Sequence, residues 1–155
     1  MKTVEIFTDG ACSGNPGKGG YGAILKYNGF EKEISEGFKC TTNNRMELLA
    51  AIKSLEMLKE PCTVKLYSDS KYLVDSVNLG WIEKWKANNW KRNRTESAKN
   101  VDLLIRLLEQ LEKHEVEFNW VKGHHGHPEN ERCDRLAVSA AQKSTLSDDV
   151  GYNNA

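Results

Sequence analysis

The chain opens on an alternating stretch that ends in an acid, Lys2-Thr3-Val4-Glu5-Ile6-Phe7-Thr8-Asp9. Its period of two predicts a β-strand, because successive side chains of a strand point to opposite faces. The short stretch 63–68 repeats this plan and is followed by Asp69. In open α/β sheets, ligands gather beyond the carboxyl ends of the strands. We therefore expect Asp9 and Asp69 to end neighbouring strands and to lie side by side.

Two further strands are predicted after the first one. They cover 21–27 and 31–40, and the dipeptide Asn28-Gly29 between them is typical of a two-residue hairpin turn. Six glycines between positions 10 and 22 predict a turn-rich connection before the second strand. These features favour an antiparallel meander of three strands.

The rest of the chain mixes helical and strand-like spacing. Apolar periodicity and capping residues predict helices over 45–59, from Ser70 to Gly80, from Asn100 to Leu111, and from Pro128 onward. Residues 115–121 alternate and predict an edge strand with one wet face. The fold class is therefore α/β, with a mixed sheet covered by helices.

Length and composition indicate one domain. The chain has 155 residues, and we expect a single domain over 1–143 and a flexible polar tail over 144–155. Basic and acidic residues both number 22, so overall charge predicts no polyanionic partner. The sequence has no apolar run of about 18 residues and no signal-peptide pattern, which favours a cytosolic protein with no membrane contact. The four cysteines form no C-x-x-C pair, which favours free thiols.

Four acids are candidate ligands for hard cations: Asp9, Glu47, Asp69 and Asp134. Phosphodiester chemistry commonly uses two Mg²⁺ or Mn²⁺ ions about 3.5–4 Å apart, held by carboxylates. Each acid also has a plainer interpretation. Asp9 and Asp69 suit turns or caps, Glu47 suits a capping box with Asn44, and Asp134 suits a solvated helix surface. Periodicity alone leaves these alternatives open.

Two other segments carry chemistry. The loop Gly123-His124-His125-Gly126-His127 offers imidazoles for proton transfer or, with Cys133, for zinc, although the spacing fits no standard zinc site. Residues 81–99 contain six basic and two acidic residues together with three tryptophans, a composition that favours binding to a nucleic-acid backbone. Packing of this protrusion onto the body is the alternative role for the tryptophans.

Four motifs together resemble bacterial type 1 ribonuclease H: Thr8-Asp9-Gly10-Ala11-Cys12-Ser13-Gly14-Asn15-Pro16-Gly17, Thr42-Asn43-Asn44-Arg45-Met46-Glu47, Tyr67-Ser68-Asp69-Ser70, and Gly123-His124 through Asn130-Glu131-Arg132-Cys133-Asp134. The resemblance covers residues 2–142. It implies a five-stranded mixed sheet, with three antiparallel meander strands and two parallel strands, flanked by helices. It also implies a monomeric endonuclease that hydrolyses the RNA strand of RNA·DNA hybrids and leaves 5′-phosphate and 3′-hydroxyl ends.

The same resemblance assigns roles to residues. It implies that the four acids bind two Mg²⁺ ions, with Mn²⁺ as a substitute, and that His124 assists proton transfer or product release. Contacts to the RNA strand would come from Cys12, Asn15, Asn43 and Asn44. Contacts to the DNA strand would come from Thr42, Asn100, Tyr72 and Trp81, and the handle over 81–99 would add Lys86, Lys91 and Arg92. Lys71 departs from the glutamine common after the Asp-Ser motif. The alternatives are an idle hybrid-binding module and a DNA-acting nuclease of the same fold.

Overall fold

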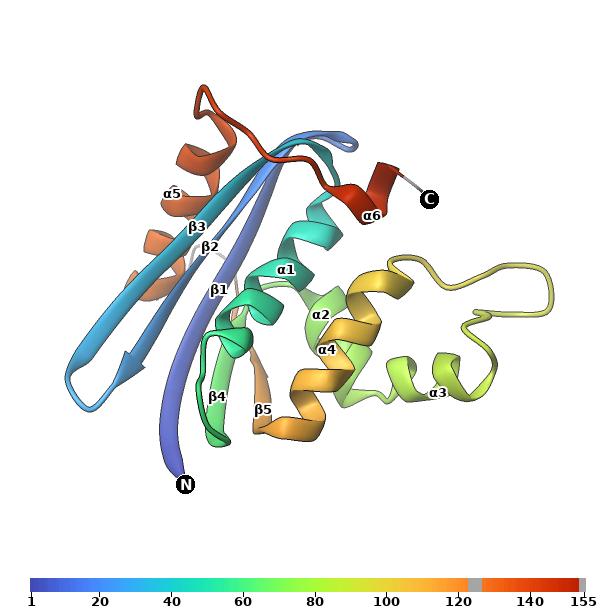
Figure 1. The fold of residues 1–155 in the computed structure, drawn as a ribbon, viewed down its shortest axis with the longest axis horizontal. Helices are drawn as coiled ribbons and strands as arrows, with labels where there is room; N and C mark the ends of the chain where they lie inside the picture. Colours follow the sequence, from blue (N-terminus) through green and yellow to red (C-terminus); the bar gives the residue numbers. More distant parts are fainter. Residues whose placement is uncertain (123–126, 154–155) are drawn as a thin grey trace.

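The computed structural model describes residues 1–122 and 127–153 as a five-stranded mixed sheet with helices on both faces (Figure 1). The elements follow the order β1 (Lys2–Gly14), β2 (Gly17–Tyr27), β3 (Phe30–Thr41), α1 (Asn43–Glu56), β4 (Cys62–Ser68), α2 (Lys71–Asn78), α3 (Trp81–Ala87), α4 (Val101–Lys113), β5 (Glu115–Trp120), α5 (Pro128–Ala141) and α6 (Val150–Asn153). The strands lie in the order β3-β2-β1-β4-β5. The predicted fold class is confirmed.

Pairing within the sheet also agrees with the prediction. β1, β2 and β3 form an antiparallel meander, whereas β4 and β5 run parallel to β1. The turn at Asn28 and Gly29 has positive φ at both residues, as a tight two-residue hairpin requires. β5 is an edge strand as expected, and Trp120 at its end has 45% of its surface exposed.

The glycine-rich connection predicted for residues 10–20 is instead β-structure. β1 continues five residues beyond Asp9, and β2 begins at Gly17, so Asp9 lies inside a strand rather than at its end. The parallel pairing of β1 with β4, however, extends only to Phe7 and Tyr67. Asp9 and Asp69 therefore lie just beyond the last paired residues of these two strands.

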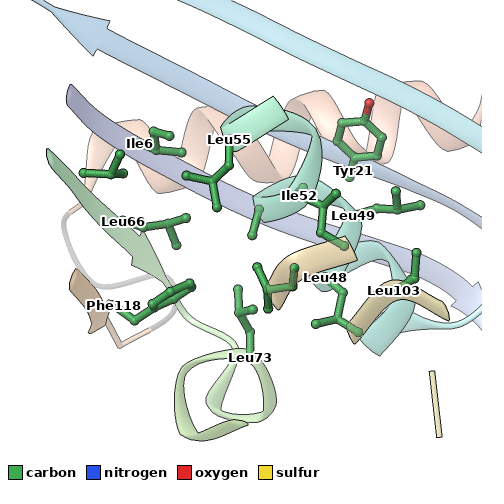
Figure 2. Packing of buried hydrophobic residues seen from close by; sticks show 14 of the residues in the cluster. Ile6, Tyr21, Leu48, Leu49, Ile52, Leu55, Leu66, Leu73, Leu103 and Phe118 are labelled. Atoms are coloured by element: carbon green, nitrogen blue, oxygen red, sulfur yellow. The ribbon is translucent and has the colours of Figure 1, made fainter. Parts of the chain in front are cut away.

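The main core lies between the sheet and the helices α1, α2 and α4 (Figure 2). Strand residues such as Ile6 and Leu66 meet Leu48 and Ile52 of α1, all of them essentially inaccessible to water. α5 covers the other face, over β1, β2 and β3. This packing fixes α1 and α5 on opposite sides of β1. Within the described residues, no helix is long and apolar enough to cross a membrane.

The described part of the segment predicted as a flexible tail, residues 144–153, contacts the body of the domain. Ser147 exchanges backbone hydrogen bonds with Gly37 and Lys39 of β3. Asp149 is only 5% exposed and accepts from the Nε and Nη2 of the buried Arg45, at 2.7 and 2.9 Å. This buried ion pair holds the segment against the body of the domain. No hydrophobic pattern in the sequence predicts the pair.

Candidate active site

Three acidic side chains converge beyond the paired ends of β1 and β4. Asp9 from β1, Glu47 from the start of α1, and Asp69 after β4 place carboxylate oxygens within 4.8 Å of one another. Asp9 is 7% exposed and Glu47 is 2% exposed. Like charges in such a setting repel one another and have lost much of their hydration. The cluster therefore favours protonation or a bound cation.

Glu47 is held in this cluster by the backbone of β1 and the end of β4. The Gly10 N–H donates to Oδ1 of Asp9 at 2.9 Å and also to Oε1 of Glu47. The Ser68 hydroxyl donates to Oε2 of Glu47 at 3.4 Å. A side chain at Gly10 would bring its Cβ to 2.7 Å from the Glu47 nitrogen, so only glycine permits this approach.

The capping-box interpretation of Glu47 is wrong. The residue that caps α1 is Thr42, whose hydroxyl accepts from the Arg45 N–H at 3.3 Å. Glu47 instead points toward the sheet, because the helical row that it shares with Ala51 and Leu55 forms the buried face of α1.

Asp134 lines the hollow of the three clustered acids because α5 lies almost directly on the backbone of β2. Gly22 pairs with Asp9 across β1 and β2. A Cβ at Gly22 would lie 2.5 Å from the carbonyl oxygen of Cys133, so the helix contacts bare backbone there. Asp134 follows Cys133, is half-buried, and lines the same hollow as the other three acids.

Burial and mutual repulsion change the proton affinity of these acids. Burial, and then the charge of Asp69, raise the pKa of Asp9 from 3.8 to about 7, although a hydrogen bond with Glu47 opposes the change. Burial and the neighbouring Asp9 raise the pKa of Glu47 well above its usual value. A divalent cation would favour the ionised form of both, and hard oxygen ligands suit Mg²⁺ or Mn²⁺. The donor set therefore fits these metals.

Several predicted substrate contacts lie around the acids. Asn43, Asn44 and Tyr72 line the hollow that holds the four carboxylates. A second hollow contains Asn15, Thr42, Asn44 and Asn100 in its wall. Asn44 lines both, so the two hollows adjoin.

Asn100 does not cap its helix with its side chain. Its Nδ2 donates to the Tyr72 hydroxyl at 3.1 Å, and its Oδ1 accepts from Arg45 Nη1 at 3.4 Å. Asn100 itself has a positive φ of 62°. The side chain therefore joins the walls of the two hollows.

Other predicted contacts lie away from the acids. Cys12 lines a different hollow, and its thiol donates to the Thr41 carbonyl at 3.4 Å. Trp81 packs against Trp85 in a tilted arrangement, with ring centroids 6.0 Å apart, at the start of the handle. The basic handle residues are exposed and line neither hollow: Lys86, Lys91 and Arg92. His124 lies outside the described residues.

Sequence reasoning missed three supporting residues. Ser68 belongs to the Tyr67-Ser68-Asp69-Ser70 motif, and its position between a strand and Asp69 is the signal that points to it. Trp120 lies in the alternating stretch 115–121, and its Nε1 donates to the Asp69 carbonyl at 3.2 Å. Asp149 lies in a polar segment, and no local pattern points to its pairing with Arg45.

Comparison with known proteins gives consistent matches. The family model described as RNase H matches residues 1–142. A protein named Ribonuclease H from Rippkaea orientalis is 61% identical over 99% of this chain and 94% of its own length. The crystal structure of LC9-RNase H1 superposes with a TM-score of 0.83 at 30% identity, over 95% of this chain and 75% of that one. LC11-RNase H1, solved in complex with RNA/DNA hybrid, has the same fold, with a TM-score of 0.68 at 23% identity over 91% and 98% of the two chains.

Proposed function

This chain belongs to the ribonuclease H family, and on that basis we propose that it hydrolyses the RNA strand of RNA·DNA hybrids. We propose further that its four acids hold two Mg²⁺ ions, and that the products carry 5′-phosphate and 3′-hydroxyl ends. The observation that supports this most directly is the convergence of Asp9, Glu47, Asp69 and Asp134 on one hollow that also contains Asn43 and Asn44.

We assign different roles in the proposed reaction to different residues of the site. Asp9 and Glu47 provide carboxylates whose positions are fixed by the Gly10 N–H, and the Ser68 hydroxyl orients Oε2 of Glu47. Bound cations would supply the charge that stabilises the attacking and leaving oxygens of the phosphodiester. His124 is proposed to transfer a proton or to assist release of the product.

Substrate choice is proposed to lie in the polar residues around the acids. Amide side chains such as Asn43 and Asn44 can both donate to and accept from a 2′-hydroxyl, the group that distinguishes RNA from DNA. The adjoining hollow with Thr42 and Asn100 is proposed to hold a phosphate of the DNA strand. Cytosolic location and the monomeric state stay predictions.

A cleavage assay tests this function and separates it from its alternatives. Labelled hybrid, duplex DNA and duplex RNA are incubated with Mg²⁺ and, in parallel, with EDTA. We expect cleavage of the hybrid's RNA strand alone, and only with the metal present. Binding without cleavage would indicate an idle binding module, and cutting of duplex DNA would indicate a DNA-acting nuclease.

Substitution of one acid tests the site itself. Asp9→Asn should abolish cleavage and leave hybrid binding and the fold intact, because it removes a ligand charge without changing the shape. The matched control is Asp148→Asn, at an acid whose side chain is 62% exposed and pairs with Lys39 on the surface. Retained Mg²⁺-dependent cleavage by the Asp9 variant would contradict the proposed site.

A further inference from the structure

Lys71 stands out at the hollow of the four acids. Among the described residues that line this hollow, it is the one with a full positive charge. It is also the first residue of α2, directly after the N-cap Ser70. The N-terminus of a helix favours negative charge, so the helix itself gives no reason for a lysine at this position.

The ring of Trp120 holds the Lys71 side chain. The Lys71 ammonium lies 4.8 Å from the centroid of this ring, a cation–π contact. The same indole donates to the carbonyl of Asp69 at 3.2 Å. Trp120 is placed there because it pairs with Ser68 across β4 and β5. One side chain therefore fixes both the backbone of Asp69 and the ammonium of Lys71.

The charge of Lys71 is left available to an anion from outside. Within residues 1–122 and 127–153, every ion pair lies elsewhere, and none neutralises the Lys71 ammonium. The Lys71 side chain is exposed, and Trp120 beneath it is 45% exposed. The contact with the ring restricts the ammonium without covering it.

We propose that Lys71 binds a phosphate of the strand being cut, next to the scissile phosphodiester, and that Trp120 positions it there. The proposal rests on the proposed function. It assigns the contact to the cut strand because Lys71 shares its hollow with Asn43 and Asn44, the side chains suited to 2′-hydroxyls. A lysine can neutralise a phosphate where a glutamine can only donate a hydrogen bond.

Salt-dependent binding of a hybrid in EDTA provides the test. Loss of one phosphate contact lowers the slope of log K against log salt by about one, which weakens binding about fivefold to tenfold near 0.1 M salt. We expect this for Lys71→Gln and a slope close to that of the wild type for Lys71→Arg. The control Lys59→Gln removes the same charge at an exposed position beyond the far end of α1.

Two variants of the aromatic residue test the positioning. Trp120→Phe keeps an aromatic ring under the ammonium, so the slope of log K against log salt should stay as in the wild type. Trp120→Leu removes the ring, so hybrid binding should weaken and the slope should shift toward that of Lys71→Gln. Equal binding by both variants would show that the ring does not position Lys71.

A hybrid with single methylphosphonate linkages locates the contact. Neutralising the phosphate that Lys71 binds should weaken binding by the wild type and have no effect on Lys71→Gln. The sensitive linkage should lie in the RNA strand beside the cleavage position. A sensitive linkage only in the DNA strand would overturn the assignment.

The possible failures are distinguishable. If the wild-type protein neither binds nor cuts the hybrid, the proposed function itself is wrong. If it does both and Lys71→Gln has the same slope as Lys59→Gln, only the inference about Lys71 is wrong. An altered Mg²⁺ requirement with unchanged hybrid affinity would show that Lys71 competes with the metal, which also overturns the inference.

Discussion

Replacement of Asp9 with asparagine should stabilise the metal-free protein most at pH 8 and by a smaller amount at pH 5. Burial and Asp69 raise the pKa of Asp9 from 3.8 to about 7 in the folded state. Between these values the folded protein binds a proton that the unfolded chain does not, so stability falls as pH rises through this window. Above about pH 7 the carboxylate is ionised in the folded protein as well, and the loss of folding stability is then complete.

The size of the effect follows from the same pKa. A change from 3.8 to about 7 corresponds to about 4 kcal/mol, since each tenfold change in proton affinity is worth about 1.4 kcal/mol. The titrations of Asp9 and Glu47 are coupled, so loss of the Asp9 charge also reduces the electrostatic repulsion on the Glu47 carboxylate. We expect Asp9→Asn to raise the free energy of unfolding by about 2–4 kcal/mol at pH 8.

Urea unfolding followed by circular dichroism in EDTA measures this change at pH 5 and pH 8. The surface control Asp148→Asn should change stability by less than about 0.5 kcal/mol at both pH values. Added Mg²⁺ should stabilise the wild type at pH 8 more than the Asp9 variant, because the metal binds only the folded state. A loss of stability in Asp9→Asn at pH 8, or a pH dependence equal to that of the wild type, would show that Asp9 does not have the raised pKa.

Two other perturbations test the fold and the handle. Asp149→Ala should destabilise the protein by about 3 kcal/mol, measured by urea unfolding, because it removes a buried partner of Arg45; an unchanged midpoint would show that Asp102 alone satisfies the guanidinium. Alanine at four handle positions together should weaken hybrid binding and flatten its salt dependence, and an unchanged slope would assign the handle to structure: Lys86, Lys91, Arg92 and Arg94.

Much of the fold could be predicted because its signals are local. The alternation over residues 2–9, the Asn28-Gly29 turn and the Ser70 cap each determine a short element whatever the rest of the chain does. The glycine-rich start of β2 was predicted as a loop because glycine has low strand propensity. In the structure, contact with α5 requires bare backbone at that place, and tertiary packing outweighs propensity.

The acids could be named from the sequence, but their convergence could not. Each acid alone suits a turn, a cap or a solvated surface, and only the pairing of β1 with β4 and the seating of α5 on Gly22 bring them together. The anchoring of Asp149 by Arg45 spans 104 positions of sequence. A contact of this kind depends on the completed fold, so local reasoning about a polar tail had no access to it.

The hydrogen bonds of Gly10 have a consequence for the energetics of metal capture. Its N–H is shared between two carboxylates on different elements, so their relative position is set by backbone and not by flexible loops. The ligands are therefore preorganised. They are already ordered before a cation binds, so binding costs little further side-chain entropy. The repulsion stored among the acids in the metal-free protein is released at the same moment. The free-energy cost of ordering the ligands is therefore met on folding, whereas in a flexible site it would be met when the cation binds.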